Sequence, residues 1–197
     1  DDCDEEEDFT TTLQAAIDKA PDSSKKTVKL LRNQDESVTI ASGKNIEFDL
    51  QNFTLSKSDV VVANNGTLAI KNGTINCTNG GAAINNNSQG TLTITGGTVK
   101  TTGTTSNAKQ AIYNDGGTLY IEGGEISTVS TSGNKARAAV HNLNNGNITV
   151  TGGTISAPNL YAIFNASGTL TIGKKDGRID TSEPTIIGKT YGVIAYS

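Results

Sequence analysis

The sequence contains no tryptophan and no methionine, and aromatic residues make up only 5% of its 197 positions. A globular domain of this size usually fills a thick core with large side chains, so this chain must bury its apolar surface in a thinner or more repetitive way. Disorder is not expected, because Leu, Ile and Val recur in a regular order. The many Thr, Asn and Gly residues favour strands and turns over helices.

Further absences restrict the partners. The net charge is −4 and no cluster of Lys and Arg could follow a phosphate backbone, so no nucleic acid is expected. No run of about 18 apolar residues is present, so we expect no membrane insertion. The single histidine and the two cysteines lack the spacing of a zinc site. We therefore expect no metal ion and no cofactor.

The chain is expected to divide into an acidic flexible leader over residues 1–9 and one domain over residues 10–197. The acids of the leader could also suggest a calcium site, but a flexible terminus supplies no fixed ligand geometry. For Cys3 and Cys77 two possibilities stay open: a disulfide between leader and domain, or two free thiols.

An internal repeat predicts the fold. Five segments begin with Gly and then alternate polar and apolar residues, at 66–70, 90–94, 117–121, 146–150 and 168–172. A second short element follows each of them, at 72–75, 96–99, 123–126, 152–155 and 176–179. A third element recurs at 61–64, 83–86, 111–114, 139–142 and 162–165. Three short strands per repeat, with Gly or Asn at the corners, predict an all-β fold, a single-stranded parallel β-helix of about six coils.

The apolar residues of these strands are predicted to face inwards and to stack in columns along the axis. The column of the second strands is expected to contain Ile75, Val99, Ile126, Ile155 and Ile179. An asparagine ends each third strand, where a sharp corner needs the αL bend that Asn tolerates, and stacked amides can hydrogen-bond to the coils above and below. The sequence therefore predicts a structural asparagine ladder of Asn64, Asn86, Asn114, Asn142 and Asn165.

The N-terminal end of the stack is expected to carry a cap, because an open solenoid end exposes apolar side chains and strand edges. A capping helix is predicted over about residues 10–20, beginning at Thr10 or Thr11, with Leu13 and Ile17 on its apolar face. Irregular first coils over 27–65 and regular coils over 66–197 are expected to follow.

The C-terminal end has no comparable cap in the sequence. Residues 191–197 align with the third strand of a coil, and Ala195 stands where the ladder would place an asparagine. We expect this uncapped end to contact further coils or another copy of the chain.

Together these features resemble the right-handed parallel β-helix superfamily typified by pectate lyases. The resemblance covers nearly the whole chain: the capping helix, the early segment over residues 45–50, the Gly-Thr-Leu-x-Ile rungs and the asparagine ladder. More narrowly, the chain is similar to β-helical segments of adhesin-like surface proteins of gut Gram-positive bacteria. The resemblance implies a right-handed coil and an extracellular or bacterial cell-surface location. Function has to come from the site, because one architecture hosts lyases, hydrolases, tailspikes and passive stalks.

No catalytic constellation is found in the repeats, so no catalytic residue is expected. A paired-carboxylate mechanism needs two acids within about 5–10 Å and with different pKa values. The best pair in the repeats is Glu122 and Glu125, for which exposed acids that keep the surface soluble are the simpler interpretation. His141, the only histidine, has no Ser, Cys or Asp partner at the spacing of a catalytic triad.

Two outward faces are candidates for binding. The first strands present a threonine-rich face that resembles the Thr arrays of ice-binding proteins but is interrupted at Lys71, Tyr120 and Glu122. Ordinary solvated strand residues are the alternative interpretation of this face.

The third strands present the second candidate face. Three aromatic rings fall on consecutive coils, about 4.8 Å apart, beside a column of small residues, and two long corner loops end in a cation. Such a surface would suit a glycan or a host or cell-surface protein; the alternative is an aromatic stack that packs under the loops. The predicted ligand-binding residues are Tyr113, His141, Phe164, Lys109 and Arg137.

The sequence thus favours a non-catalytic β-helix module of a secreted or cell-surface bacterial protein, serving as a stalk or as an adhesion or glycan-binding surface. The alternative is a polysaccharide-active lyase or hydrolase of the pectate-lyase-like superfamily, or a fragment of one. An ice-binding protein is the third hypothesis.

Overall fold

The structure is a computed structural model that describes residues 12–103, 110–131, 138–173, 183–189 and 191–196. Within that part the chain forms one short helix, α1 (Leu13–Lys19), and nineteen strands. Some of the residues named above lie outside it: the leader over 1–9 with Cys3, the helix starts Thr10 and Thr11, the predicted binding residues Lys109 and Arg137, and Ile179.

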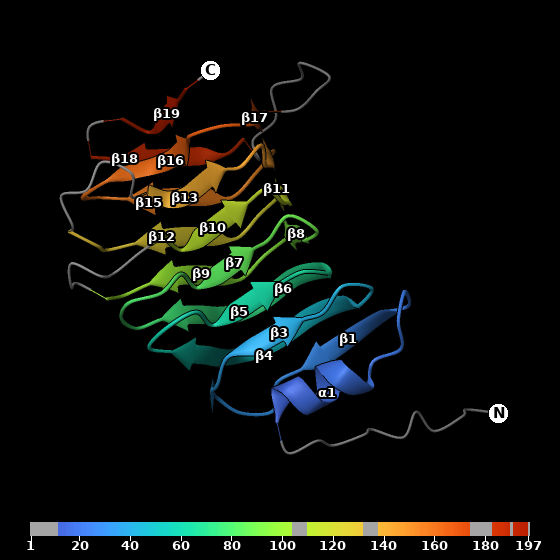
Figure 1. Cartoon of the computed structure of the whole chain (residues 1–197). Helices are drawn as coiled ribbons and strands as arrows, with labels where there is room; N and C mark the ends of the chain where they lie inside the picture. The colour runs from blue at the N-terminus through green and yellow to red at the C-terminus, as the bar shows by residue number, and fades with distance from the viewer. Residues whose placement is uncertain (1–11, 104–109, 132–137, 174–182, 190, 197) are drawn as a thin grey trace.

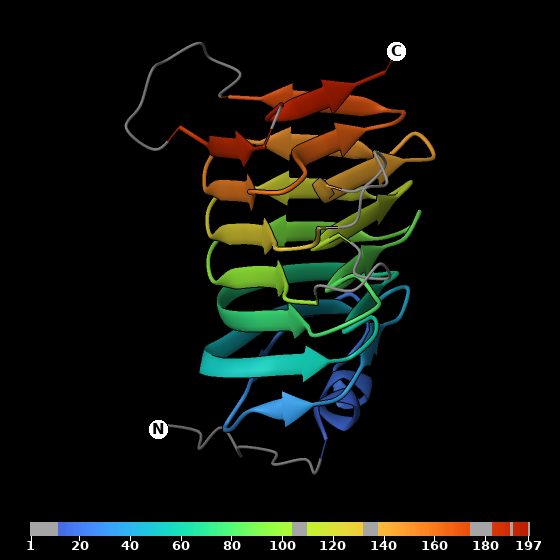
Figure 2. The same ribbon diagram turned by 90° about the vertical axis from the view of Figure 1, so that its left-hand side faces the viewer.

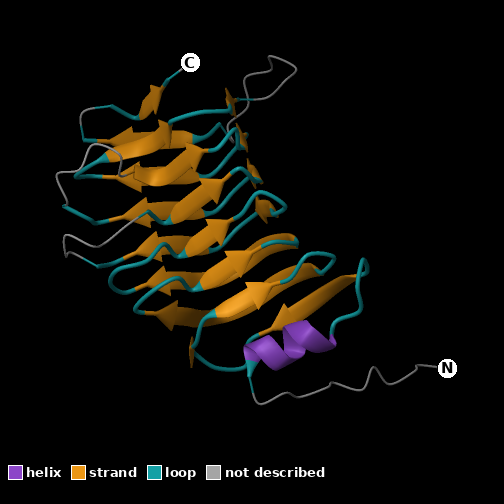
Figure 3. Ribbon diagram, in the orientation of Figure 1, coloured by secondary structure: helices purple, strands orange, loops and turns teal. Residues whose placement is uncertain are grey.

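The strands wind into a right-handed parallel β-helix of about six turns, in which each coil lies on the one before it (Figure 1). Figure 3 shows the helix at the N-terminal end of the stack and strands along the rest. The predicted fold class is therefore confirmed.

One twelve-stranded sheet contains the first and second strands of the coils. In the upper coils the first strands are β8 (Thr91–Ile94), β11 (Thr118–Ile121), β14 (Asn147–Val150) and β17 (Thr169–Ile172). The second strands are β9 (Thr98–Thr101), β12 (Glu125–Thr128), β15 (Thr154–Ala157) and β18 (Thr185–Gly188). Neighbouring strands are parallel, so equivalent residues of successive coils lie side by side.

In two lower coils the first and second strands are joined in one long strand, β4 (Asn45–Lys57) and β6 (Thr67–Cys77). Gly73 has a φ of +71°, and a Cβ there would lie 2.4 Å from Cβ of Leu50, so only glycine bends this closely over the coil below. The prediction of three separate strands in every coil is corrected for these two. The short strands β1 (Lys25–Lys29) and β2 (Gln34–Asp35) pair with β4.

The third strands form a separate seven-stranded sheet, whose strands are labelled in Figure 1. Figure 2 shows the same stack of coils turned by 90°. They are β3 (Val38–Ile40), β5 (Val62–Asn64), β7 (Ile84–Asn86), β10 (Ile112–Asp115), β13 (Ala138–Leu143), β16 (Tyr161–Asn165) and β19 (Val193–Ala195).

The interior consists of stacked aliphatic side chains, each contributing roughly 1.5–3 kcal/mol of transfer free energy. One first-strand column is expected to contain Leu68, Leu92, Leu119, Ile148 and Leu170; the first four are at most 1% exposed, whereas Leu170 in the last coil is only partly buried. The second-strand column differs from the prediction in the last coil, where Ile186 of β18 pairs with Ile155. The repeat spacing predicts Ile179 at this position, because it places a short corner after β17, whereas β18 begins only at Thr185.

Helix α1 covers the N-terminal end of the stack. Its N-cap is Thr12, whose hydroxyl accepts a hydrogen bond from the Ala15 amide at 3.1 Å, so the predicted starts at Thr10 and Thr11 are corrected by one or two residues. Leu13 and Ile17 are buried against the first coil, as the apolar face of the helix predicted.

Polar side chains of the cap also block an open strand edge. Gln14 accepts a hydrogen bond from the Thr39 amide at 2.7 Å and donates one to the Thr39 carbonyl at 3.1 Å, so its side-chain amide takes the place of a neighbouring strand at β3. Lys44 donates to the carbonyls of Asp18 and Ala20 and so holds the other end of the helix on the coil.

At the C-terminal coil the situation is different. The side chains of Ile172, Ile187, Tyr191 and Tyr196 are 44–61% exposed. Ala195 pairs with Asn165, as the alignment of the last segment indicated. The expected contact of this end with further coils or another copy stays a prediction.

Five asparagines at the ends of the third strands form one hydrogen-bonded column through the stack. The side-chain Nδ2 of each donates to Oδ1 of the next, at 2.8, 2.7, 2.7 and 2.6 Å from the first pair to the last. None of the five side chains is more than 4% exposed. The column joins Asn64, Asn86, Asn114, Asn142 and Asn165.

We expect Asn114→Ala to lower the free energy of unfolding by about 2–4 kcal/mol, because it leaves buried polar groups of Asn86 and Asn142 without their ladder partner. Asn165→Ala is the matched control: it breaks one ladder bond instead of two and should cost only about 1 kcal/mol. Urea unfolding followed by circular dichroism measures both. Equal losses for the two variants would contradict a cooperative ladder.

A second substitution tests the close approach of the coils. Gly124 has a φ of +76°, and a Cβ there would lie 2.8 Å from the Gly97 carbonyl oxygen. Gly43 has a φ of +87° but nothing within 4 Å of the same position. We expect Gly43→Ala to cost about 1–2 kcal/mol of backbone strain and Gly124→Ala a further 1–3 kcal/mol, roughly, for the clash. Urea midpoints that are equal for the two variants would contradict the packing argument.

Candidate functional site

The predicted aromatic column lies on the outer side of the seven-stranded sheet. Tyr113, His141 and Phe164 occupy equivalent positions on β10, β13 and β16. The ring centroids of Tyr113 and His141 are 5.4 Å apart at 86°, and those of His141 and Phe164 are 5.0 Å apart at 68°. These edge-to-face contacts continue to Tyr196, 5.6 Å from Phe164.

Most of this column is buried. His141 is 8% and Phe164 9% exposed, and Tyr113 is only partly exposed. The neighbouring small residues, expected to lie beside the rings on an open surface, are fully buried at Ala83, Ala111, Ala139 and Ala162. The column therefore offers a ligand little area, and the packed aromatic stack accounts better for its geometry. Lys109 and Arg137, the cations expected at its rim, lie outside the described residues.

His141 has one polar neighbour that the sequence did not suggest. Nε2 of the buried Gln110 lies 3.0 Å from Nδ1 of His141, and this orientation has the amide donating to an unprotonated ring nitrogen. Burial lowers the pKa of His141 below its ordinary value. The imidazole is thus held neutral, as a packed and hydrogen-bonded ring.

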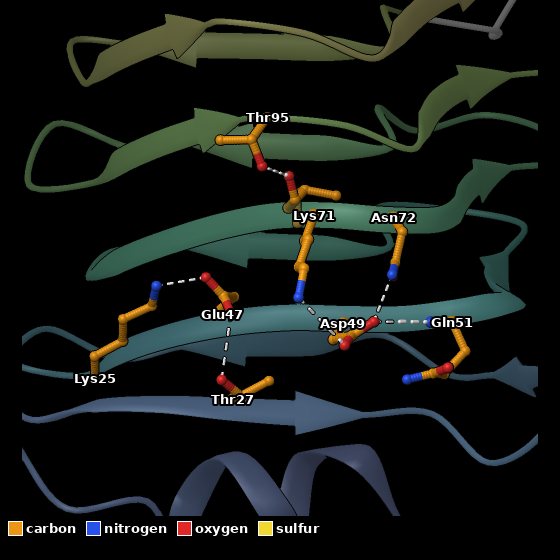
Figure 4. Close-up of polar contacts among 9 residues, drawn as sticks. Lys25, Thr27, Glu47, Asp49, Gln51, Lys71, Asn72 and Thr95 are labelled. Carbon is orange, nitrogen blue, oxygen red and sulfur yellow. Dashed lines mark hydrogen bonds and ion pairs between the residues drawn. The ribbon is translucent and has the colours of Figure 1, made fainter.

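A second polar cluster lies on the outer face of the twelve-stranded sheet, over the first coils (Figure 4). Glu47 and Asp49 point outwards from β4. Lys25 forms an ion pair with Glu47 at 2.5 Å, and Lys71 lies 3.8 Å from Asp49. Asn72 donates a hydrogen bond to Asp49 at 2.5 Å. We call these five residues the carboxylate–lysine cluster.

Both carboxylates of this cluster are held in the ionised form. The hydrogen bond from Asn72 lowers the pKa of Asp49, and the hydrogen bond from Lys25 lowers that of Glu47; each effect outweighs the opposing cost of burial. A general acid needs a raised pKa, so neither group is tuned for that role. The pair proposed from the sequence, Glu122 and Glu125, lies fully on the exposed surface.

The regular repeat does not reveal the cluster, because Glu47 and Asp49 precede the first regular rung at residue 66. The alternation in residues 45–50 already signals that Glu47 and Asp49 share a face. Their partners could not be read from the repeat, since a register shift between Phe48 and Asp49 places Asp49 opposite Asn72. Only the structure shows that Lys71 and Asn72 both reach the same carboxylate.

The threonine-rich face lies on the same sheet, above the cluster. We define the threonine face as the outward side chains of β8, β11 and β14 and of the residue after each strand: Thr91, Thr93, Thr95, Thr118, Tyr120, Glu122, Asn147, Thr149 and Thr151.

Cys77 is a free, fully buried thiol, and Cys3 lies outside the described residues. In the described residues no three side chains among His, Cys, Asp and Glu come together as a metal site would require. The part of the chain that the structure describes contains no helix with the length and apolar character to cross a bilayer.

His141 gives the protein a pH-dependent stability. The unfolded chain takes up a proton near pH 6.5, whereas the folded protein resists it because the pKa is lowered. Stability is therefore full above about pH 6.5 and falls as the pH drops from there towards the lower folded pKa. We expect His141→Phe to remove this decline. Urea midpoints measured between pH 7.5 and 5 test this, because the lower limit stays roughly one pH unit above the ordinary pKa range of carboxylates. A wild type whose midpoint does not fall over this interval would contradict the buried neutral ring.

Comparison of the chain with protein-family models, with curated proteins and with solved structures gave no match. The parallel β-helix is shown by the structure itself. The narrower resemblance to pectate-lyase-like proteins and to adhesin-like surface proteins gains no support from the comparisons and stays a prediction. The chain is thus placed by its architecture, a parallel β-helix of about six turns.

Proposed function

We propose that the chain is a non-catalytic β-helix module of a secreted or cell-surface bacterial protein, acting as a stalk or adhesion surface. The observation that carries this proposal is the unbroken hydrogen-bonded ladder from Asn64 to Asn165. Together with the aliphatic columns it fixes each coil on the next, as a rigid spacer needs. The location rests on the resemblance of the repeats to surface proteins.

The outer faces support a non-catalytic role. The residues of the threonine face are mostly threonines, with Glu122 as the one acid. In the carboxylate–lysine cluster each acid forms an ion pair with a lysine and accepts a hydrogen bond from a further side chain. These are the contacts of a stable surface, where each charge has a partner.

A polysaccharide-active lyase or hydrolase is the second candidate. The observation that favours it is the carboxylate–lysine cluster itself, since Glu47, Asp49 and Lys71 are acid and base groups on one sheet face (Figure 4). The lowered pKa of both carboxylates argues against a pair that divides acid and base roles. Ice binding has less support, because Tyr120 interrupts the threonine face.

A turnover assay separates the two candidates. We expect the protein to release neither unsaturated uronate, followed by its absorbance, nor reducing ends from pectin, polygalacturonate, xylan or mannan. Asp49→Asn is the matched variant, because it keeps the shape of the side chain and removes the charge that faces Lys71. Turnover by the wild type that is lost in Asp49→Asn would overturn the non-catalytic proposal and assign the reaction to the cluster.

A further inference from the structure

Tyr120 is the aromatic residue of the threonine face, and its side chain is 39% exposed. The strand register places Thr93 of the coil below and Thr149 of the coil above in the same outward column. Coils are spaced about 4.8 Å apart. The ring is thus bracketed along the axis of the stack by two side-chain hydroxyl groups at fixed distances.

Polar side chains also line both sides of this column. On one side Thr118 occupies the outward position two residues before Tyr120, and on the other Glu122 lies two residues after it. The amide of Glu122 donates to the Ile94 carbonyl at 2.9 Å, so the alignment of the coils continues past the end of the strand. An exposed ring is therefore set in a flat surface of hydroxyls with one carboxylate.

The charge of this surface restricts what it can bind. All nine side chains of the threonine face are described, and among them Glu122 carries the only charge. The described lysines of the same sheet lie on other strands: Lys25, Lys26 and Lys29 on β1, Lys57 on β4, Lys71 on β6 and Lys100 on β9. Within the threonine face a uronate or sulfated ligand at Tyr120 would meet the Glu122 carboxylate and no cation, whereas an uncharged ligand meets no such penalty.

We propose that the threonine face binds a neutral glycan centred on Tyr120. The apolar C–H face of a sugar ring packs on the tyrosine ring, as aromatic side chains pack on apolar surfaces, and the sugar hydroxyls hydrogen-bond with Thr93, Thr149 and the carboxylate of Glu122. This inference rests on the proposed function, because it names the ligand class of an adhesion surface. The affinity is low, with Kd in the millimolar range, since the face is open and holds one ring.

The experiment uses the ¹⁵N-labelled chain and four neutral probes, cellohexaose, xylohexaose, mannohexaose and maltohexaose, with trigalacturonate as the anionic probe. We expect at least one neutral probe, at about 10 mM, to shift the amide signals of Thr93, Tyr120 and Thr149. Tyr120→Ala should weaken that binding at least about tenfold, whereas Tyr120→Phe, which keeps the ring, should bind within about threefold. Leu31→Ala, at an apolar side chain that is 64% exposed elsewhere, is the control and should bind like the wild type.

Three results would overturn the inference: no neutral probe shifts these signals, Tyr120→Ala binds like the wild type, or trigalacturonate binds the same residues as tightly as the best neutral probe. Tyr120 is exposed, so its variants should unfold at the urea midpoint of the wild type, which guards against a folding artefact. The failure of this inference is distinguishable from that of the proposed function. If the protein neither binds the probes nor turns over polysaccharide, only the proposal of a glycan ligand fails. If it turns over polysaccharide, the non-catalytic proposal fails, whatever the Tyr120 variants show.

Discussion

Parallel pairing of each strand with the equivalent strand of the coil below is the constraint on which the rest of this structure depends. Because the pairing is in register, equivalent residues of successive coils lie side by side, about 4.8 Å apart along the axis. Each residue must therefore pack against or bond with a residue of the same or a similar type. Aliphatic residues do so by packing and asparagines by passing a hydrogen bond from Nδ2 to Oδ1. Glycines do so by letting backbones approach, as Gly124 does over Gly97.

The same constraint governs which surfaces are free to act. Stacking turns Tyr113, His141 and Phe164 into a packed column, so rings that suggest a binding platform in the sequence mostly contact one another. It also turns the outward threonines into a flat array on which Tyr120 stands exposed. The glycan surface proposed on this scaffold therefore centres on a departure from the repeat, Tyr120, and uses the repeated outward threonines beside it.

The sequence predicted the columns and the ladder well because the same residue types recur at equivalent positions of successive coils. The assignment of one strand therefore supports the assignment of the next. Predictions failed for features that occur only once in the chain and at points where the spacing of the repeat changes. Ile186 was missed because the last coil has a longer corner before β18, and the cluster at Asp49 because a register shift in β4 brings Asn72 opposite it. The helix start moved to Thr12 because its hydroxyl is the one that caps the first turn.

By itself the sequence determined the architecture, since alternating apolar residues with Gly and Asn corners can bury their columns only by stacking. It also determined the asparagine column, because the nearest hydrogen-bond partner of each corner amide is the equivalent asparagine amide of the neighbouring coil. Only the tertiary structure decided exposure and charge pairing: that His141 is buried beside Gln110, that Lys71 reaches Asp49, and that Tyr120 stays open. These depend on contacts between side chains of different coils and loops, and such contacts are set by distances in space that residue spacing along the chain does not fix.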